Sequence, residues 1–227
     1  GTGGAAVNGR ISAAAMRKSL GVYLVIGSAN CRQDPLQVTE QALAGGATMI
    51  QFREKGPGAL TGGPKLRLAE QLQAACRRAG VPFIVNDDVD LALAIDADGI
   101  HVGQDDEAAG RVRARIGERI LGVSAHTVEE ARLAIHSGAD YLGIGPIYPT
   151  ASKADAREPQ GPGFIRRLRE CGIEAPLVAI GGITAASAGE AIRAGADGIA
   201  VISAVTQAAD VRKAVEELHA AAALGRG

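Results

Sequence analysis

The sequence contains no tryptophan, and aromatic residues make up only 3% of its 227 residues. This scarcity argues against the aromatic platforms on which single-stranded nucleic acid stacks. The net charge of -1 argues against broad electrostatic attraction to nucleic acid. No apolar run is long enough to span a bilayer, and residues 1–20 lack the pattern of a signal peptide. We therefore expect neither a nucleic-acid partner nor a membrane partner.

Cysteine is also scarce. The three cysteines, Cys31, Cys76 and Cys171, are widely spaced and odd in number. This arrangement fits neither a disulfide framework nor a zinc knuckle. We expect free thiols in a cytoplasmic protein, because reducing compartments keep thiols reduced.

What the chain does contain is a repeating unit: a short apolar run, a loop, a helical pattern, a glycine and the next apolar run. Most of these runs are continuously apolar, as expected for strands of a parallel sheet that is covered on both faces. The expected strands are Val22–Ile26, Met49–Phe52, Phe83–Val85, Ile100–Val102, Ile120–Val123, Tyr141–Ile144, Leu177–Ile180 and Ile199–Ile202.

Helix-boundary signals fill the gaps between these runs. Asp34-Pro35 predicts a helix start, and Thr127 with Glu130 predicts a capping box. Two joints resemble each other, Ser137-Gly138-Ala139-Asp140 and Ala194-Gly195-Ala196-Asp197. Their glycines predict left-handed helix ends followed closely by a strand.

Eight such units in 227 residues average about 28 residues each, which predicts a single-domain α/β fold, the (β/α)8 TIM barrel. A doubly wound open sheet is the alternative, but no Gly-x-Gly-x-x-Gly follows the first expected strand. We expect a flexible segment at residues 1–9, the barrel over residues 10–227, and an extra N-terminal helix within residues 10–20 that covers the barrel bottom.

The reactive groups of such a barrel lie where its strands end. The second expected strand runs directly into Arg53 and Lys55. These are either solvated surface charges or an anion clamp, since Arg offers a planar fork and Lys a point charge to phosphate oxygens. The glycine- and proline-rich residues 56–64 behind them are a candidate mobile lid.

Carboxylates follow the third and fourth expected strands. Asp88 is placed to cap the next helix, which leaves Asp87 to face the barrel mouth, and Asp105-Asp106 follow the neighbouring strand. Oxygen ligands from adjacent strand ends suit Mg²⁺, which takes one or two carboxylates and completes its shell with phosphate. Helix capping throughout is the alternative.

The fifth expected strand leads into Ser124-Ala125-His126. No nucleophile-elbow motif surrounds this serine, so its hydroxyl is expected to donate to an oxyanion. His126 is either a site residue or a packed or capping histidine. His101 lies inside a strand, and we expect it to belong to the core or to the barrel lining and not to act as a ligand.

The last three expected strands are followed by polar or glycine-rich loops. The segment from Gly145 to Lys153 presents hydroxyls and a lysine, Gly181-Gly182 exposes backbone N–H groups, and Ile202-Ser203 follows the eighth strand. Loops after strands seven and eight form the recurrent phosphate site of these barrels. Tight-turn glycines are the alternative.

The strand ends together offer cations, backbone amides and a candidate divalent-metal site. These are more anion-binding groups than one monophosphate requires. A diphosphate with Mg²⁺ plus a second phosphate fits them better. No strong nucleophile or well-placed general base is evident in the sequence. The pattern therefore favours chemistry in which stabilisation of a leaving diphosphate lowers the barrier.

These motifs resemble those of the thiamine-phosphate synthase family. The resemblance covers about residues 10–220, with the motifs in order. They are Gln51-Phe52-Arg53-Glu54-Lys55, Val85-Asn86-Asp87, Gly103-Gln104-Asp105-Asp106, Gly122-Val123-Ser124-Ala125-His126, Gly145-Pro146-Ile147-Tyr148-Pro149-Thr150 and Gly181-Gly182-Ile183.

The resemblance implies a transferase that condenses 4-amino-2-methyl-5-(diphosphooxymethyl)pyrimidine with 4-methyl-5-(2-phosphoethyl)thiazole, or its 2-carboxy form. Diphosphate would leave first and give a pyrimidine methyl cation, which the thiazole nitrogen attacks. The implied catalytic residues are Arg53, Lys55, Ser124 and Lys153. The implied pyrimidine diphosphate ligands are Gln51, Phe52, Arg53, Glu54, Lys55, Asn86, Ser124 and Lys153. The implied Mg²⁺ ligands are Asp87 and Asp106. The implied thiazole phosphate ligands are Thr150, Ala151, Ser152, Gly182, Ile202 and Ser203.

One departure from the family is mild: Ser152 stands where threonine is usual, and serine keeps the hydroxyl. Ala151 falls at a variable position, so any contact there is through the backbone. A thiazole tautomerase of similar fold and a non-catalytic regulator are the alternatives, and the diphosphate clamp with its metal pair favours the synthase. The partners implied are small phosphorylated molecules, and a homo-oligomer is compatible with the sequence.

Overall fold

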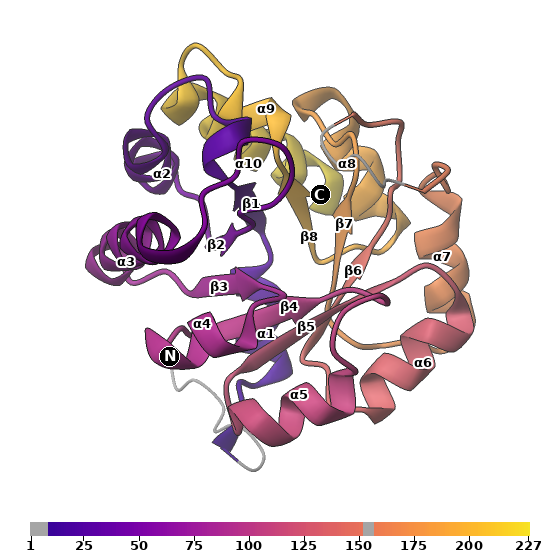
Figure 1. Ribbon diagram of the computed structural model, residues 1–227. Coiled ribbons are helices and arrows are strands. Elements are labelled where there is room, and N and C mark those ends of the chain that lie inside the picture. The colour runs from indigo at the N-terminus through magenta and orange to yellow at the C-terminus, as the bar shows by residue number, and fades with distance from the viewer. Residues whose placement is uncertain (1–8, 152–156) are drawn as a thin grey trace.

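Eight parallel strands form a closed barrel, and each strand pairs with its neighbours in chain order. This computed structural model describes residues 9–151 and 157–227. Figure 1 shows the helices arranged around the strands. The prediction of a TIM barrel is therefore confirmed, and the open-sheet alternative is excluded because β1 pairs with β8.

The strands agree with the apolar runs, except for small differences at their ends. They are β1 Val22–Ile26, β2 Met49–Phe52, β3 Phe83–Asn86, β4 Gly99–Val102, β5 Ile120–Ala125, β6 Tyr141–Ile144, β7 Leu177–Ile180 and β8 Gly198–Val201. The eighth strand ends one residue earlier than expected, so Ile202 belongs to the loop at the mouth. The fifth continues to Ala125 and so includes Ser124.

Helices separate the strands and form the outer layer. They are α1 Ala13–Ser19, α2 Pro35–Ala44, α3 Gly62–Ala79, α4 Val89–Ala94, α5 Ala109–Ile116, α6 Val128–His136, α7 Gly163–Glu170, α8 Ala185–Ala194, α9 Ser203–Thr206 and α10 Val211–Arg226, with a short 3-10 turn η2 at Ser28–Asn30. Helix α10 packs against both α8 and α2 and so completes the ring.

Side chains alternate between two buried layers along each strand, as the pleat requires. In β1, Leu24 and Ile26 belong to the core between the barrel and the helices. Tyr23 and Val25 belong to a second cluster inside the barrel. The continuous apolar runs therefore reflect strands that are buried on both faces.

The extra N-terminal helix is present as α1. Its Met16 and the C-cap residue Leu20 are fully buried in the cluster that fills the barrel interior. Helix α1 thus closes the barrel end opposite the mouth. The expected flexible segment at residues 1–9 lies almost entirely outside the described residues.

The two similar joints form similar structures. Asp140, which precedes β6, accepts a hydrogen bond from the backbone N–H of Leu121 at the start of β5. Asp197, which precedes β8, accepts one from Leu177 at the start of β7. An arginine from the helix one unit earlier also bonds each carboxylate: Arg113 on α5 bonds Asp140, and Arg169 on α7 bonds Asp197. The repeated Gly-Ala-Asp motif therefore ties consecutive strands together at the barrel bottom.

The helix starts agree with the sequence signals. Asp34 caps α2 by accepting from the Gln37 N–H, with Pro35 in the first turn. Thr127 caps α6 by accepting from the Glu130 N–H at 3.0 Å. Glu130, however, accepts from the N–H of His126 and not from that of Thr127. Only one of the two hydrogen bonds of the predicted capping box is therefore present, because the Glu130 side chain bonds the residue before the cap.

Within the described residues, no helix combines the length and the apolar character needed to cross a membrane.

Candidate active site

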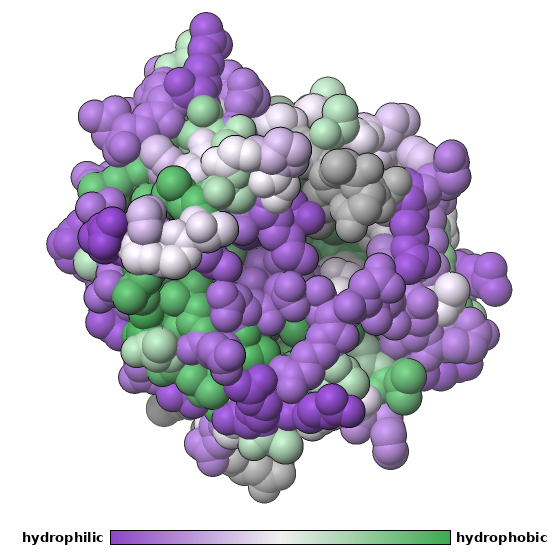
Figure 2. All heavy atoms as spheres, in the orientation of Figure 1, coloured by the Kyte–Doolittle hydropathy of each residue, from purple (hydrophilic) through white to green (hydrophobic). Residues whose placement is uncertain are grey.

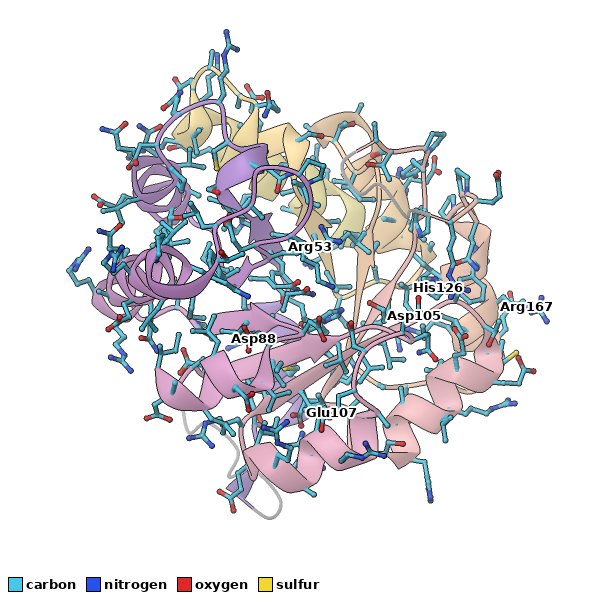
Figure 3. All side chains as sticks on the ribbon, in the orientation of Figure 1. Arg53, Asp88, Asp105, Glu107, His126 and Arg167 are labelled. Atoms are coloured by element: carbon cyan, nitrogen blue, oxygen red, sulfur yellow. The ribbon has the colours of Figure 1, made fainter. Side chains whose placement is uncertain are left out.

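A cavity of about 220 Å³ opens at the carboxyl ends of the strands. Figure 2 shows hydrophilic residues over the middle of this face, beside a hollow. In Figure 3, Arg53 lies near the centre of the barrel, whereas Arg167 lies at the periphery. Predicted site residues that line the cavity are Arg53, Lys55, Asn86, Asp106, Ser124, Thr150, Gly182, Ile202 and Ser203.

The five residues from Gln51 to Lys55 do not all face the cavity, because successive side chains of an extended segment point in opposite directions. Arg53 and Lys55 line the cavity. Gln51 lies one pleat deeper, with its side chain inside the barrel, and only 4% of the residue is exposed. Phe52 faces outward and stacks on Phe83 in the core beneath the helices. Any contact of Phe52 with a ligand is therefore limited to its backbone.

Glu54 also faces away from the cavity. It is 8% exposed and accepts hydrogen bonds from the Ser28 N–H at 2.8 Å and the Leu60 N–H at 2.9 Å, as well as from the Ser28 hydroxyl. This carboxylate therefore joins the loop after β1 to the loop after β2. Because Glu54 lies between the two cations in sequence, it holds the backbone from which Arg53 and Lys55 project.

Two carboxylates lie on either side of the Lys55 ammonium. Its Nζ is 3.4 Å from Asp87 Oδ2 and 3.8 Å from Asp106 Oδ1. Burial raises the pKa of the Asp106 carboxyl and the neighbouring Asp87 raises it further, while the Gly103 N–H and Lys55 oppose the shift. Two partly buried carboxylates that share one ammonium have a local excess of negative charge.

The backbone also places these carboxylates. Asp87 has a φ of 64°, a left-handed conformation that is uncommon for a residue other than glycine and is concentrated at functional sites. Asp106 is held by the Gly103 N–H, which donates to Oδ2 at 2.7 Å. Asp88 caps α4 through the Leu91 N–H, as expected, and also binds Lys65 at 2.9 Å.

Among the described residues, no group of three or more His, Cys, Asp or Glu side chains is placed to hold a metal ion. A pair of carboxylates nevertheless fits Mg²⁺, which keeps several waters and substrate oxygens in its shell. The positively charged Lys55 between Asp87 and Asp106 marks the position as one that accepts a cation. The donor set is therefore suitable for Mg²⁺ shared with a phosphorylated ligand.

Ser124 lies at the end of β5 inside the barrel wall. Its Oγ is 2.8 Å from His101 Nε2, and its backbone carbonyl accepts from the Gln104 side chain at 2.7 Å. His126 faces the rim, where its Nδ1 is 2.8 Å from the carbonyl oxygen of Gly145. The two histidines thus differ: His101 bonds to the serine hydroxyl, and His126 bonds to the loop after β6.

The loops after β6 and β7 fit tightly together. Gly181 and Gly182 have positive φ angles of 102° and 65°, and a Cβ atom on Gly182 would lie 2.5 Å from the Pro149 carbonyl oxygen. Only glycine is accommodated there. Four residues that follow the adjacent strands β6, β7 and β8 line the cavity, namely Thr150, Gly182, Ile202 and Ser203.

Besides Gln51, Phe52 and Glu54, two predicted site residues that the structure describes do not line the main cavity. Ala151 is exposed and is not among the residues that line the cavity. Asp87 lines an adjacent recess that shares Lys55 and Asn86 with the main cavity. Ser152 and Lys153 fall outside the described residues.

The structure also adds residues that the sequence did not single out. Arg157 and Gln104 line the cavity. Tyr23 and Tyr141 meet inside the barrel beneath it, with their hydroxyl oxygens 2.7 Å apart. The only sequence signal for these tyrosines is a polar hydroxyl within a strand that is otherwise apolar.

Comparisons with known proteins agree with this geometry. The family model described as "Thiamine monophosphate synthase" matches residues 22–205. A curated relative named "Thiamine-phosphate synthase" from Geobacillus kaustophilus (strain HTA426) is 60% identical over 96% of this chain and 98% of its own length. One of the same name from Geobacillus thermodenitrificans (strain NG80-2) is 59% identical over 93% and 96%.

A solved structure shows the same similarity in three dimensions. "Thiamine phosphate pyrophosphorylase from Pyrococcus furiosus" superposes with a TM-score of 0.84 at 38% identity, covering 93% of this chain and 100% of that chain.

Proposed function

We propose that this chain, which belongs to the thiamine-phosphate synthase family, carries out the reaction of that family at the mouth of its barrel. It is a transferase that forms thiamine phosphate. The substrates are 4-amino-2-methyl-5-(diphosphooxymethyl)pyrimidine and 4-methyl-5-(2-phosphoethyl)thiazole or its 2-carboxy form, and diphosphate is released.

One observation carries the site assignment: two cations and two carboxylates meet at adjacent strand ends. Arg53 and Lys55 line the cavity, and Lys55 lies between Asp87 and Asp106. A diphosphate carries more negative charge than one arginine and one lysine neutralise. A divalent cation on the two carboxylates would supply the remaining positive charge.

Asp87 and Asp106 would hold Mg²⁺, with Lys55 released to the diphosphate. When bound, Mg²⁺ neutralises charge on the departing diphosphate and so favours cleavage of its bond to the pyrimidine methylene. Asp106 keeps its orientation through the Gly103 N–H, so it is preorganised for the ion.

The reaction then follows a dissociative path. Arg53, Lys55, Ser124 and Lys153 hold the diphosphate oxygens and stabilise their charge as the carbon–oxygen bond breaks. Asn86 lies next to the metal ligand Asp87 and faces the same cavity, and with Gln51 it orients the pyrimidine. The thiazole nitrogen attacks the resulting methyl cation.

The opposite side of the cavity receives the thiazole phosphate. Thr150, Gly182 and Ser203 offer hydroxyl and backbone N–H donors, and Ile202 provides an apolar surface. Ser152 and the backbone of Ala151 complete this set. This division leaves the two anionic groups on opposite sides, with the reacting carbon and nitrogen between them.

We place the reaction in the cytoplasm, where the free thiols of Cys31, Cys76 and Cys171 are kept reduced. The partners are small phosphorylated molecules. Assembly into a homo-oligomer is compatible with this function.

The function is tested by mixing the two substrates with purified protein and Mg²⁺ and measuring diphosphate release together with thiamine phosphate formation. We expect both products in equal amounts, and removal of Mg²⁺ with a chelator stops both. Absence of diphosphate with isomerisation of the thiazole carboxylate present would identify a tautomerase instead. Binding of the substrates without turnover would indicate a regulator.

The metal assignment is tested by the double variant Asp87→Asn with Asp106→Asn. We expect activity to be lost, because two neutral amides bind Mg²⁺ weakly. A Mg²⁺ titration of activity measures the effect, with Asp105→Asn as the neighbouring control. A normal Mg²⁺ titration curve in the double variant would refute the assignment.

A further inference from the structure

A continuous chain of polar side chains crosses the barrel interior beneath the cavity. The Tyr23 and Tyr141 hydroxyl oxygens are 2.7 Å apart, and the Tyr141 hydroxyl oxygen is 2.9 Å from His101 Nδ1. Tyr23 is 1% exposed and Tyr141 is fully buried. These groups come from β1, β6 and β4, so the closure of the barrel brings them together.

Both ends of this chain reach residues of the proposed site. At one end, Gln51 Nε2 donates to the Tyr23 hydroxyl at 2.8 Å, and Asn86 Nδ2 donates to Gln51 Oε1 at 3.1 Å. At the other end, His101 Nε2 is 2.8 Å from Ser124 Oγ. The chain therefore connects Asn86 to Ser124 through the barrel interior, and both of these residues line the cavity.

The amide donor at the Gln51 end of the chain determines the direction of the hydrogen bonds that follow. The Gln51 NH₂ group can only donate, so the Tyr23 oxygen accepts from it. The single proton of Tyr23 then has one acceptor among its hydrogen bonds, the Tyr141 oxygen. The opposite direction would leave that buried proton without a partner, which costs free energy.

The remaining hydrogen bonds, from Tyr141 to Ser124, have the same direction. Tyr141 accepts from Tyr23, so its own proton is donated to His101 Nδ1. His101 is consequently neutral, with its proton on Nε2, and it donates to Ser124 Oγ. The Ser124 oxygen is thereby engaged as an acceptor, and its hydroxyl proton is free to be donated to a ligand in the cavity.

The surroundings favour this arrangement. Burial raises the pKa of Tyr23 and of Tyr141 well above the ordinary value, so both phenols remain protonated and each has one proton to donate. Glycine provides the space, because a Cβ atom on Gly122 would lie 2.1 Å from the Tyr141 ring and one on Gly143 would lie 3.1 Å from the His101 ring. Larger side chains at these positions would displace the two rings.

We propose that Tyr23, Tyr141 and His101 are positioning residues that hold the Ser124 hydroxyl as a hydrogen-bond donor toward the departing diphosphate. This inference rests on the proposed function, which places Ser124 against that group. A chain directed from the Gln51 amide toward Ser124 keeps the serine proton on the side where negative charge develops. Preorganised donors of this kind need no rearrangement during the reaction.

The direction of the chain is tested in the free protein, without substrates. The sequence contains four histidines, so ¹⁵N labelling of the imidazole nitrogens gives a short spectrum, in which a His101→Asn variant assigns the His101 signals. We expect His101 to have an unprotonated Nδ1 and a protonated Nε2. A protonated Nδ1 would mean that the chain runs the other way, and this would overturn the proposal whatever reaction the protein catalyses.

Two variants test whether Tyr141 or Ser124 determines which ring nitrogen of His101 carries the proton. Tyr141→Phe removes the donor to Nδ1, and we expect His101 to become a mixture of tautomers. Ser124→Ala leaves that donor in place, so the Nε2–H tautomer is retained. Tyr148→Phe is the matched control, because it removes a hydroxyl that bonds to Glu190 on α8 and does not belong to the hydrogen-bonded chain. This variant should leave the His101 spectrum unchanged. Loss of the tautomer in Ser124→Ala would overturn the proposal.

A double-mutant cycle separates positioning from packing. We expect Tyr141→Phe to lower kcat about tenfold, the scale of one hydrogen bond, with a smaller change in KM. In the Ser124→Ala background, Tyr141→Phe should cost almost nothing further, because the group that it positions is absent. An equal loss in both backgrounds would show a purely structural role. Tyr23→Phe, which breaks the chain one bond earlier, should reproduce the pattern.

Discussion

Carboxylates at the two ends of the barrel differ in burial and in the number of their cationic partners. At the bottom, Asp140 is bonded by Arg10 at 2.8 Å and by Arg113 at 2.6 Å, and 3% of its side chain is exposed. At the mouth, Asp87 and Asp106 share Lys55 at 3.4 and 3.8 Å, with 36% and 16% of their side chains exposed. One carboxylate at the bottom is therefore paired with two cations, whereas two carboxylates at the mouth share one.

The difference shows how a TIM barrel divides its charged residues between stability and function. The bottom pairs also bond the backbone: Asp140 accepts from the Leu121 N–H, and Asp197 does the same for Leu177. The mouth keeps an unmatched negative charge that a metal ion with an anionic ligand can use. Stability of the fold and binding of a ligand therefore depend on opposite ends of the same strands.

The largest expected effect is on stability at the bottom. Asp140→Asn removes the charge that neutralises Arg113, whose side chain is 16% exposed. We expect the free energy of unfolding to fall by about 3–5 kcal/mol, because breaking a buried pair leaves an uncompensated charge. Denaturant unfolding measures the change.

The matched control is the exposed pair of Arg212 and Glu216 on α10. Glu216→Gln should change the free energy of unfolding by less than about 0.5 kcal/mol. Similar losses in the two variants would remove the distinction between the bottom pairs and ordinary surface pairs.

A smaller effect is expected at the mouth, on rate instead of stability. Lys153→Ala should raise the activation free energy by about 2–4 kcal/mol through loss of one preorganised donor to the diphosphate, with the free energy of unfolding nearly unchanged. Single-turnover kinetics of diphosphate release measure the change. An unchanged rate would remove Lys153 from the mechanism.

The smallest effect is expected for Glu54. This carboxylate lies at the mouth, but it is buried and bonds backbone N–H groups, as Asp140 and Asp197 do at the bottom. Glu54→Gln places an NH₂ group against the N–H groups of Ser28 or Leu60. We expect the free energy of unfolding to fall by about 1–2 kcal/mol. Affinity for inorganic diphosphate with Mg²⁺, measured by calorimetric titration, should weaken as well, because Arg53 and Lys55 lose their support.

Glu70→Gln, at an exposed position on α3, is the control for this variant and should leave both quantities unchanged. Weaker binding of the pyrimidine diphosphate in Glu54→Gln, with undiminished stability, would place Glu54 on the substrate.

The strand ends could be predicted from the sequence because burial on both faces leaves a local pattern, an apolar run that stops at polar residues. Arg53, Lys55, Asp106 and Ser124 were all predicted from their places just after or at the end of such runs, and the structure places them around one cavity. The direction of individual side chains was harder to predict. Phe52 and Glu54 share a motif with Arg53 but face the opposite layer, because the pleat alternates.

The eight-unit barrel, most helix caps and the concentration of charge at one end of the strands can be predicted from local sequence patterns, since all of these follow from neighbouring residues. Contacts between distant residues, in contrast, become visible in the folded barrel. Tyr23 and Tyr141 are 118 positions apart, and Arg10 reaches Asp140 across 130. Such contacts depend on barrel closure and register, which place one residue from each strand in the same interior layer, and no local pattern specifies them.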